Sequence, residues 1–307
     1  MYKFSVFANF LINDEIRFKI MKDSFNSFCD SNISDWVINI RGNYKYHASN
    51  FLKKNIKKGL KIFFLDSPQG WNYDTSQIIK FTKSEYIFFW IEDHLCISGN
   101  NLLNKTIRSI YINKIDYMCY SWFFFGNNIK SLNFIHLNED NNIYYLNYSK
   151  NLHLNREKFS LLNDIIYENF IISMCSIMKR KLFISILFSR DKFFYKWSKK
   201  LPFNFEKTNI DTHWLPYKLA LSKNELFASI DDDLGYAGYS LISRNLYQCD
   251  SLKVRNVKSK RNILLNNKIF SKPKNFLYFF IKKIFNELFI LIFLIKKKYY
   301  RFYDKFI

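Results

Sequence analysis

The sequence predicts an α/β protein whose central sheet is mostly parallel and flanked by helices. Strand-like and helix-like segments alternate through the first 125 residues. Helical stretches of about ten to fifteen residues between strands are typical of right-handed crossovers in a parallel sheet. The run Tyr86–Ile91 is apolar throughout, which indicates a strand that is buried on both faces.

The first expected elements are a strand, Phe4–Phe10, and a helix that Asn13 or Asp14 caps and that runs to about Phe28. An apolar stripe along this helix comprises Ile16, Ile20, Met21, Ser24 and Phe28. The next elements are, in order, a strand Asp35–Ile40, a helix Ser49–Lys58, a strand Lys61–Leu65, a helix Thr75–Thr82, the strand that begins at Tyr86, a helix Asn104–Lys114 and a strand Asp116–Phe124.

The second half of the chain is less regular. Strands are expected at Ser131–Leu137 and Asn142–Asn147, followed by an apolar region, Leu161–Phe188, that we interpret as helix and then strand. Together these elements predict one large domain over residues 1–250, divided near residue 125, and a C-terminal extension over residues 251–307.

The C-terminal extension is strongly basic and rich in aromatic residues. It contains 15 Lys and Arg against 2 Asp and Glu, so it carries +13 of the net charge of +21. Its longest apolar run, Leu288–Ile295, has eight residues, fewer than the roughly 20 that span a bilayer. The pattern favours an amphipathic helix that lies on a membrane surface, and the alternative is a helix that packs on protein.

Two further features indicate the compartment. The N-terminus lacks a charged segment followed by a long apolar run, so we expect no secretory signal and a cytoplasmic location. The five cysteines form no CxxC pair, which disfavours a zinc site. Cys96, Cys119 and Cys175 have apolar neighbours and are expected in the core of a protein from a reducing compartment.

The strongest candidate site is Glu92-Asp93-His94, which directly follows the apolar strand. Charged groups cannot continue into a buried core, and ligands of open α/β sheets bind at the carboxyl ends of the strands. Alternation in an extended segment would point Glu92 and His94 to one side and Asp93 to the other. Carboxylate and imidazole groups together can bind Mn²⁺ or Mg²⁺. The alternative is a strand end held by salt bridges.

Four other polar residues, Asn9, Arg41, Asn43 and Asp66, are expected at strand C-termini, where they can contact a base, a ribose or a phosphate. The sequence has no GxGxxG after the first strand and no GxxxxGK[ST]. A bound diphosphate would therefore have to be neutralised by a cation or by Arg and Lys side chains.

A second acidic segment, Asp231-Asp232-Asp233, is followed by two of only seven glycines, Gly235 and Gly238. Three successive carboxylates repel one another, and one that faces the first site is a candidate general base. The alternative is a solvated acidic turn. Upstream, His213 and Trp214 are candidates for contacts with a sugar acceptor, and the alternative for His213 is a structural role.

These residues resemble the nucleotide-sugar glycosyltransferases of the GT-A fold, in which a strand ends in a D-x-D motif that binds a divalent cation and the donor diphosphate. The resemblance covers roughly residues 3–125, and Glu92-Asp93-His94 departs from D-x-D toward a D-x-H form. It implies that Glu92, Asp93 and His94 bind the metal and that Asn9, Arg41, Asn43, Asp66 and Asp93 bind the donor.

The resemblance further implies a transferase of bacterial surface-polysaccharide synthesis, peripheral at the inner face of the cell membrane. One of Asp231, Asp232 and Asp233 would be the catalytic base, and a glycan or lipid-linked molecule the acceptor. Three alternatives are a nucleotidyltransferase, a pseudoenzyme, and a nucleic-acid-binding protein that uses the basic extension. The charge lies in a tail rather than on a recognition motif, which disfavours nucleic acid.

Overall fold

A computed structural model describes residues 2–119, 138–149, 175–188, 216–230, 240–242 and 244–248. All of these belong to the first of two units into which the chain divides, Met1–Val254 and Arg255–Ile307. The predicted C-terminal extension lies outside the described residues, so its role and the domain limits at 125 and 250 stay predictions. None of the described helices is long and apolar enough to cross a membrane.

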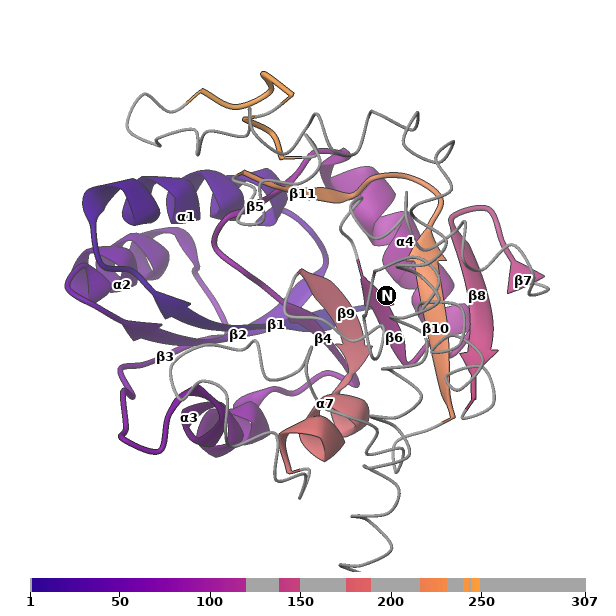
Figure 1. Ribbon diagram of the computed structural model, residues 1–307, viewed down its shortest axis with the longest axis horizontal. Coiled ribbons are helices and arrows are strands. Elements are labelled where there is room, and N and C mark those ends of the chain that lie inside the picture. Colours follow the sequence, from indigo (N-terminus) through magenta and orange to yellow (C-terminus); the bar gives the residue numbers. More distant parts are fainter. Residues whose placement is uncertain are drawn as a thin grey trace, which may run out of the picture. The chain divides into compact units, whose positions relative to one another are not determined.

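The described strands form a mixed sheet with the order β3-β2-β1-β4-β9-β6-β10-β8-β7 (Figure 1). Only β8 and β9 among these strands run opposite to the rest. The strand bounds are β1 (Phe4–Leu11), β2 (Ile33–Arg41), β3 (Leu60–Phe63), β4 (Tyr86–Phe89), β6 (Tyr117–Cys119), β7 (Asn138–Glu139), β8 (Ile143–Tyr148), β9 (Ser176–Lys179) and β10 (Tyr217–Ser222). The predicted mostly parallel sheet is therefore confirmed.

Helices cover both faces of the sheet (Figure 1). Side chains of α1 (Glu15–Phe28), α2 (Lys45–Asn55) and α4 (Gly99–Ile112) pack on one face. Side chains of α3 (Trp71–Ile78) and α7 (Arg180–Leu187) pack on the other face. A 3-10 turn, η1 (Ile79–Phe81), follows α3. A parallel strand covered in this way must be apolar on both sides, as β4 is.

Helix α1 begins and packs as the sequence predicts. The Asp14 carboxylate accepts a hydrogen bond from the backbone N–H of Arg17 at 2.8 Å, which satisfies one of the free donors of the first turn. The buried residues of α1 recur at helical spacing and are Ile20, Met21, Ser24, Phe25 and Phe28. This stripe fixes which side of α1 faces the sheet.

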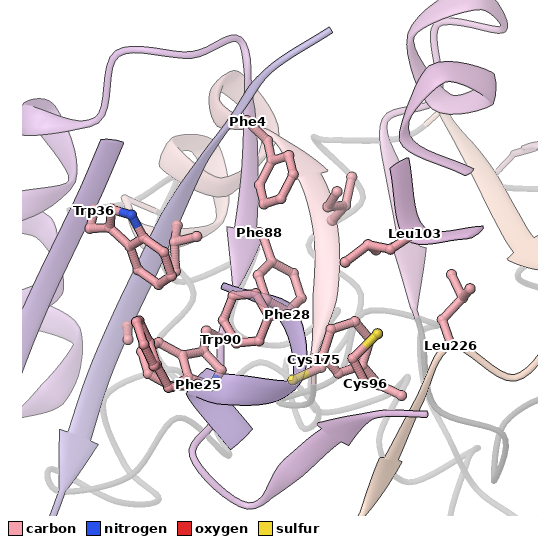
Figure 2. Close-up of a cluster of buried hydrophobic side chains, with 14 of the residues drawn as sticks. Phe4, Phe25, Phe28, Trp36, Phe88, Trp90, Cys96, Leu103, Cys175 and Leu226 are labelled. Carbon is pink, nitrogen blue, oxygen red and sulfur yellow. The ribbon is translucent and has the colours of Figure 1, made fainter. Parts of the chain in front are cut away.

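Aromatic rings dominate the core beneath α1 (Figure 2). The Trp90 ring meets Phe10 edge to face with centroids 4.6 Å apart and also contacts Phe28 and Trp36. Edge-to-face pairs add to the stabilisation from buried area. Trp90 thus anchors the chain immediately before Glu92-Asp93-His94.

Several elements differ from prediction. Helices α2, α3 and α4 each begin four or five residues earlier than expected, at Lys45, Trp71 and Gly99. Gly70 and Gly99 have positive φ, so the chain can turn sharply there and a helix can start at once. In Leu161–Phe188 the described residues contain strand β9 followed by helix α7, a helix that was not predicted, while the helix expected before the strand lies outside the described residues. The expected strand Ser131–Leu137 lies outside the described residues.

The turn after β2 depends on glycine at position 42. Gly42 has φ +90°, and a Cβ there would lie 2.5 Å from the carbonyl oxygen of Ile12. That oxygen already accepts the N–H of Tyr44 at 2.9 Å, while the Ile12 N–H donates to the Arg41 carbonyl at 2.9 Å. The end of β1 and the start of α2 are therefore joined through a space that admits no side chain.

We expect Gly42→Ala to lower the free energy of unfolding by more than the roughly 1–2 kcal/mol of a left-handed backbone alone, because it adds a clash. Gly99→Ala is the matched control, since Gly99 has φ +75° but a Cβ there would meet no atom of the described residues within 4 Å. Urea unfolding of both variants measures the difference. Equal losses would contradict the close contact at Gly42.

Candidate active site

The acidic motif forms a turn at the carboxyl end of β4. Residues 92 and 93 make the turn, and His94 begins a short strand, β5 (His94–Cys96). Strand β5 pairs antiparallel with β11 (Phe227–Ser229), and His94 is opposite Ser229. The expected strand-like alternation through 92–94 is wrong, because a turn places Glu92 and Asp93 toward the same guanidinium group.

That guanidinium belongs to Arg17 in the first turn of α1. Its Nη1 lies 3.2 Å from Asp93 Oδ2 and 3.6 Å from Glu92 Oε1. Both carboxylates are largely buried, so an opposite charge is needed to offset their desolvation. Arg17 provides it, although no pattern in the sequence indicated this role.

The second oxygen of Asp93 holds the imidazole of His94. His94 Nδ1 lies 2.7 Å from Asp93 Oδ1, and because a carboxylate can only accept, Nδ1 carries the proton. His94 is only 6% exposed, and its Nε2 is buried without a hydrogen-bond partner among the described residues. In the neutral ring Nε2 carries the lone pair, so the Asp93 contact leaves one nitrogen with unused acceptor capacity.

Hydrogen bonds to the carbonyl oxygens of Asp93 and His94 hold the turn from two sides. The Ser24 hydroxyl of α1 donates to the His94 carbonyl oxygen and accepts the indole N–H of Trp90 at 2.8 Å. On the other side, the Ile230 N–H donates to the Asp93 carbonyl oxygen at 2.7 Å. The turn is thus joined to α1, to the end of β4 and to the residue that follows β11.

The acidic pair has divergent pKa values. Burial, and then the negative charge of Asp93, raises the pKa of Glu92 to about 7. Burial alone would raise the pKa of Asp93 as well, but the hydrogen bond with His94 and the interaction with Arg17 outweigh it and lower that pKa to about 2. Asp93 is therefore fully ionised at neutral pH, whereas Glu92 is only partly ionised.

The residues Asp231, Asp232 and Asp233 lie outside the described residues, but the chain on both sides of residues 231–239 is described. Ile230 is bonded to Asp93, as above. After the segment, the Leu241 N–H donates to the Ser229 carbonyl at 2.9 Å and the Ile242 N–H donates to the Ile230 carbonyl at 3.2 Å. The described residues that flank 231–239 are thus bonded to one another, and Ile230 is also bonded to the Glu92–Asp93 turn.

A second polar cluster lies at the carboxyl ends of β1 and β2. Asn39 Nδ2 donates to Asn9 Oδ1 at 3.0 Å, and Arg41 Nε donates to the same oxygen at 3.2 Å. Asn9 Nδ2 donates to the Thr75 hydroxyl at 2.9 Å, and Trp71 Nε1 donates to the Asn9 carbonyl at 3.2 Å. The predicted residues Asn9 and Arg41 therefore contact each other directly.

The charged members of this cluster differ in exposure. Arg41 is 3% exposed, and burial lowers its pKa against the opposing effect of Asp66. Asp66, with a side chain that is 68% exposed, lies 3.8 Å from Arg41 Nη1. Asn43 is exposed in the turn before α2 and makes no side-chain hydrogen bond with another described residue. The structure brings together Asn9, Arg41 and Asp66 but not Asn43.

Five residues that complete these clusters were not predicted from sequence, namely Arg17, Ser24, Asn39, Trp71 and Thr75. Only the position of Asn39, two residues before the end of β2, offered a signal.

His213 and Trp214 lie outside the described residues. Where residues are described, no group of three or more His, Cys, Asp or Glu side chains is arranged to hold a metal ion. The His94 nitrogen and the neighbouring carboxylates are nevertheless donor types that Mn²⁺ accepts.

No protein-family model matches the chain, and no curated protein matches it. Among solved structures it is similar to S. aureus TarS 1–349, with 14% identity over 74% of this chain and 60% of that chain and a TM-score of 0.45. It is also similar to S. aureus TarS, with 13% sequence identity over 74% of this chain and 36% of that chain and a TM-score of 0.45. A third similar structure is S. aureus TarS 1–349 in complex with UDP-GlcNAc, with 11% sequence identity over 73% of this chain and 59% of that chain and a TM-score of 0.36.

The chain thus covers less than two thirds of the length of these structures.

We expect Glu92→Gln to change how stability depends on pH. The pKa of Glu92 is near 4.5 in the unfolded chain and is raised to about 7 in the folded state. The wild type therefore loses stability as the pH rises from about 4.5 to about 7. The variant lacks this loss, so its stability relative to wild type should rise by roughly 1–3 kcal/mol across that range. Urea unfolding from pH 4.5 to 8 measures it.

The exposed Glu15→Gln in the first turn of α1 is the matched control for this series. If the wild-type and Glu92→Gln profiles run parallel over the whole pH range, Glu92 ionises equally in both states and the described burial is wrong.

Proposed function

We propose that this chain is a GT-A-like glycosyltransferase that moves a sugar from a nucleotide-diphosphate donor to a hydroxyl group of a glycan or lipid-linked acceptor. The observation that carries the proposal is the Glu92-Asp93-His94 turn at the carboxyl end of β4, tied by Ile230 to the chain that leads into Asp231. The described residue that precedes Asp231 is thus bonded to the turn at the carboxyl end of β4, and ligands of such sheets bind at the carboxyl ends of the strands.

Asn9, Arg41, Asn43 and Asp66, which follow or end β1 to β3, are the proposed donor-binding residues together with Asp93. The amides of Asn9 and Asn39 are consumed by internal hydrogen bonds, so they shape and stiffen the edge. Arg41 Nη1 lies 3.8 Å from Asp66 Oδ1, and of these two groups the 68% exposed Asp66 carboxylate is the one that a donor can contact directly. The buried Arg41 adds positive charge beneath it.

Glu92, Asp93 and His94 are the residues that would hold a divalent cation, either Mn²⁺ or Mg²⁺. When bound, such a cation supplies positive charge to the leaving diphosphate. His94 Nε2 has the unused lone pair, and Asp93 orients the ring through Nδ1. Arg17 supplies a second positive charge at the same turn, whose electrostatic effect on the leaving group adds to that of Arg41.

One of Asp231, Asp232 and Asp233 is the proposed general base. Its carboxylate takes the proton of the acceptor hydroxyl as the oxygen attacks the anomeric carbon, and the nucleoside diphosphate departs with the bonding electrons. The anchoring of Ser229 and Ile230 beside the Glu92–Asp93 turn supports the assignment. His213 and Trp214 are proposed acceptor contacts.

The basic extension over residues 251–307 supports a location at a membrane surface. Its lysines and aromatic residues suit an anionic membrane surface, which places the enzyme beside lipid-linked acceptors. We therefore propose a peripheral location at the inner face of a bacterial cell membrane and a role in surface-polysaccharide synthesis.

We expect Asp93→Ala and His94→Ala each to reduce sugar transfer at least 100-fold in an assay with a panel of nucleotide sugars and Mn²⁺, because each removes a group that binds the donor diphosphate or its cation. Asp30→Ala, which changes an exposed carboxylate after α1, is the matched control. Wild-type activity in both site variants would refute the assignment.

The same assay separates the three candidate bases. Asn substitution of one of Asp231, Asp232 and Asp233 should lower kcat by about 10²–10⁴ while the KM for the donor changes little. Full activity in all three variants would place the base elsewhere.

A further inference from the structure

The guanidinium group of Arg17 contacts the carboxylate oxygens that a divalent cation at the acidic turn would need. Arg17 Nη1 lies 3.2 Å from Asp93 Oδ2 and 3.6 Å from Glu92 Oε1. The other oxygen of Asp93 lies 2.7 Å from His94 Nδ1 and is engaged there. A cation that binds Asp93 through its remaining oxygen therefore meets a positive charge that already contacts the same atom.

The candidate ligands are also not gathered around one point while Arg17 contacts them. His94 Nε2 is buried without a hydrogen-bond partner among the described residues. Within the same part of the chain, no three His, Cys, Asp or Glu side chains are arranged to hold a metal ion. Mn²⁺ takes several oxygen and nitrogen ligands at once, so its binding here requires the two carboxylates to be released from the guanidinium.

Arg17 is the member of this group that can move most easily. Its side chain is 35% exposed, whereas the side chains of Glu92 and Asp93 are 15% and 18% exposed. The bonds from Ser24 and Ile230 hold the carbonyl oxygens of the turn without any contribution from Arg17. The guanidinium can therefore leave toward solvent, or toward an anionic ligand, while the backbone of the turn keeps its place.

We propose that Arg17 is an internal competitor of the divalent cation, which lowers the metal affinity of the Glu92-Asp93-His94 turn until the guanidinium moves away. The inference rests on the proposed function and adds the residue that sets the cation affinity of the same turn. A phosphate group offers Arg17 an alternative anionic partner, because a guanidinium binds phosphate through two parallel hydrogen bonds. The cation and a phosphate-bearing ligand should consequently bind more tightly together than either binds alone.

The test measures Mn²⁺ binding to the full chain at pH 8 by isothermal titration, with the metal as the only ligand. Arg17→Gln should raise the Mn²⁺ affinity on the order of 10-fold, because it removes a positive charge beside the cation. Arg17→Met, which keeps the apolar stem, is a second uncharged variant and should behave in the same way. Arg17→Lys keeps the charge and should stay closer to wild type.

Lys19→Gln is the matched control, because it removes an exposed cation from the same helix, and it should leave the Mn²⁺ affinity unchanged. Thermal unfolding provides a second readout. Without Mn²⁺, Arg17→Gln should unfold at a lower temperature than wild type, because two largely buried carboxylates lose their counter-charge. Added Mn²⁺ should then raise its unfolding temperature by more than it raises that of wild type.

The outcomes separate the competition from the proposed function. Mn²⁺ affinities of the two uncharged variants that equal or fall below that of wild type would overturn the competition, and so would the absence of Mn²⁺ binding to every one of these proteins. Tighter binding by both variants, or binding by the variants alone, supports it. Sugar transfer by the wild type is assayed independently, so a failure of the proposed function leaves a measured competition at Arg17 standing.

Discussion

The hydroxyl of Ser24 is the interaction on which the arrangement around the acidic turn depends. Trp90 is buried at the end of β4, and its indole N–H needs an acceptor there. Ser24 supplies that acceptor and donates in turn to the His94 carbonyl, so one side chain of α1 joins the end of β4 to the start of β5. Arg17 lies seven residues earlier, about two helical turns, on the same helix. The packing of α1 against the sheet therefore positions both the turn and the Arg17 guanidinium, whose positive charge offsets the two carboxylates.

A related constraint governs the neighbouring strand ends. Asn9 and Asn39 are paired in the register of β1 and β2, and their side chains bond to each other rather than to solvent. Buried amides are costly unless every polar atom finds a partner, and Thr75 and Leu65 provide the remaining ones. The result is a stiff polar edge without a glycine-rich phosphate loop. Asp66, whose side chain is 68% exposed, is the charged group of that cluster that faces solvent, while Arg41 is buried.

Local patterns predicted the parts of the fold that local physics decides. The apolar run at Tyr86 became β4, and Asp14 capped α1, because burial and capping each depend on a few neighbouring residues. The antiparallel strand β9 was not predicted, since strand direction depends on pairing between residues about 90 positions apart.

The same distinction applies to the candidate site. The sequence located Glu92-Asp93-His94 at a strand end, but the assumed alternation failed because residues 92 and 93 turn. The role of Arg17 could not be read from sequence, since it meets Asp93 only after α1 packs against the sheet.

The central claim, that the edge formed by the Glu92-Asp93-His94 turn and the Arg41 cluster binds a nucleotide sugar, is tested most directly by thermal unfolding of the full chain with UDP-, GDP-, CMP- and dTDP-sugars, with and without Mn²⁺. Ligands that bind only the folded state raise its stability by mass action. We predict that sugars of one nucleotide raise the unfolding temperature with increasing concentration, and that Asp93→Asn abolishes this rise. Stabilisation by none of them, combined with salt-sensitive stabilisation by DNA or RNA, would contradict the claim.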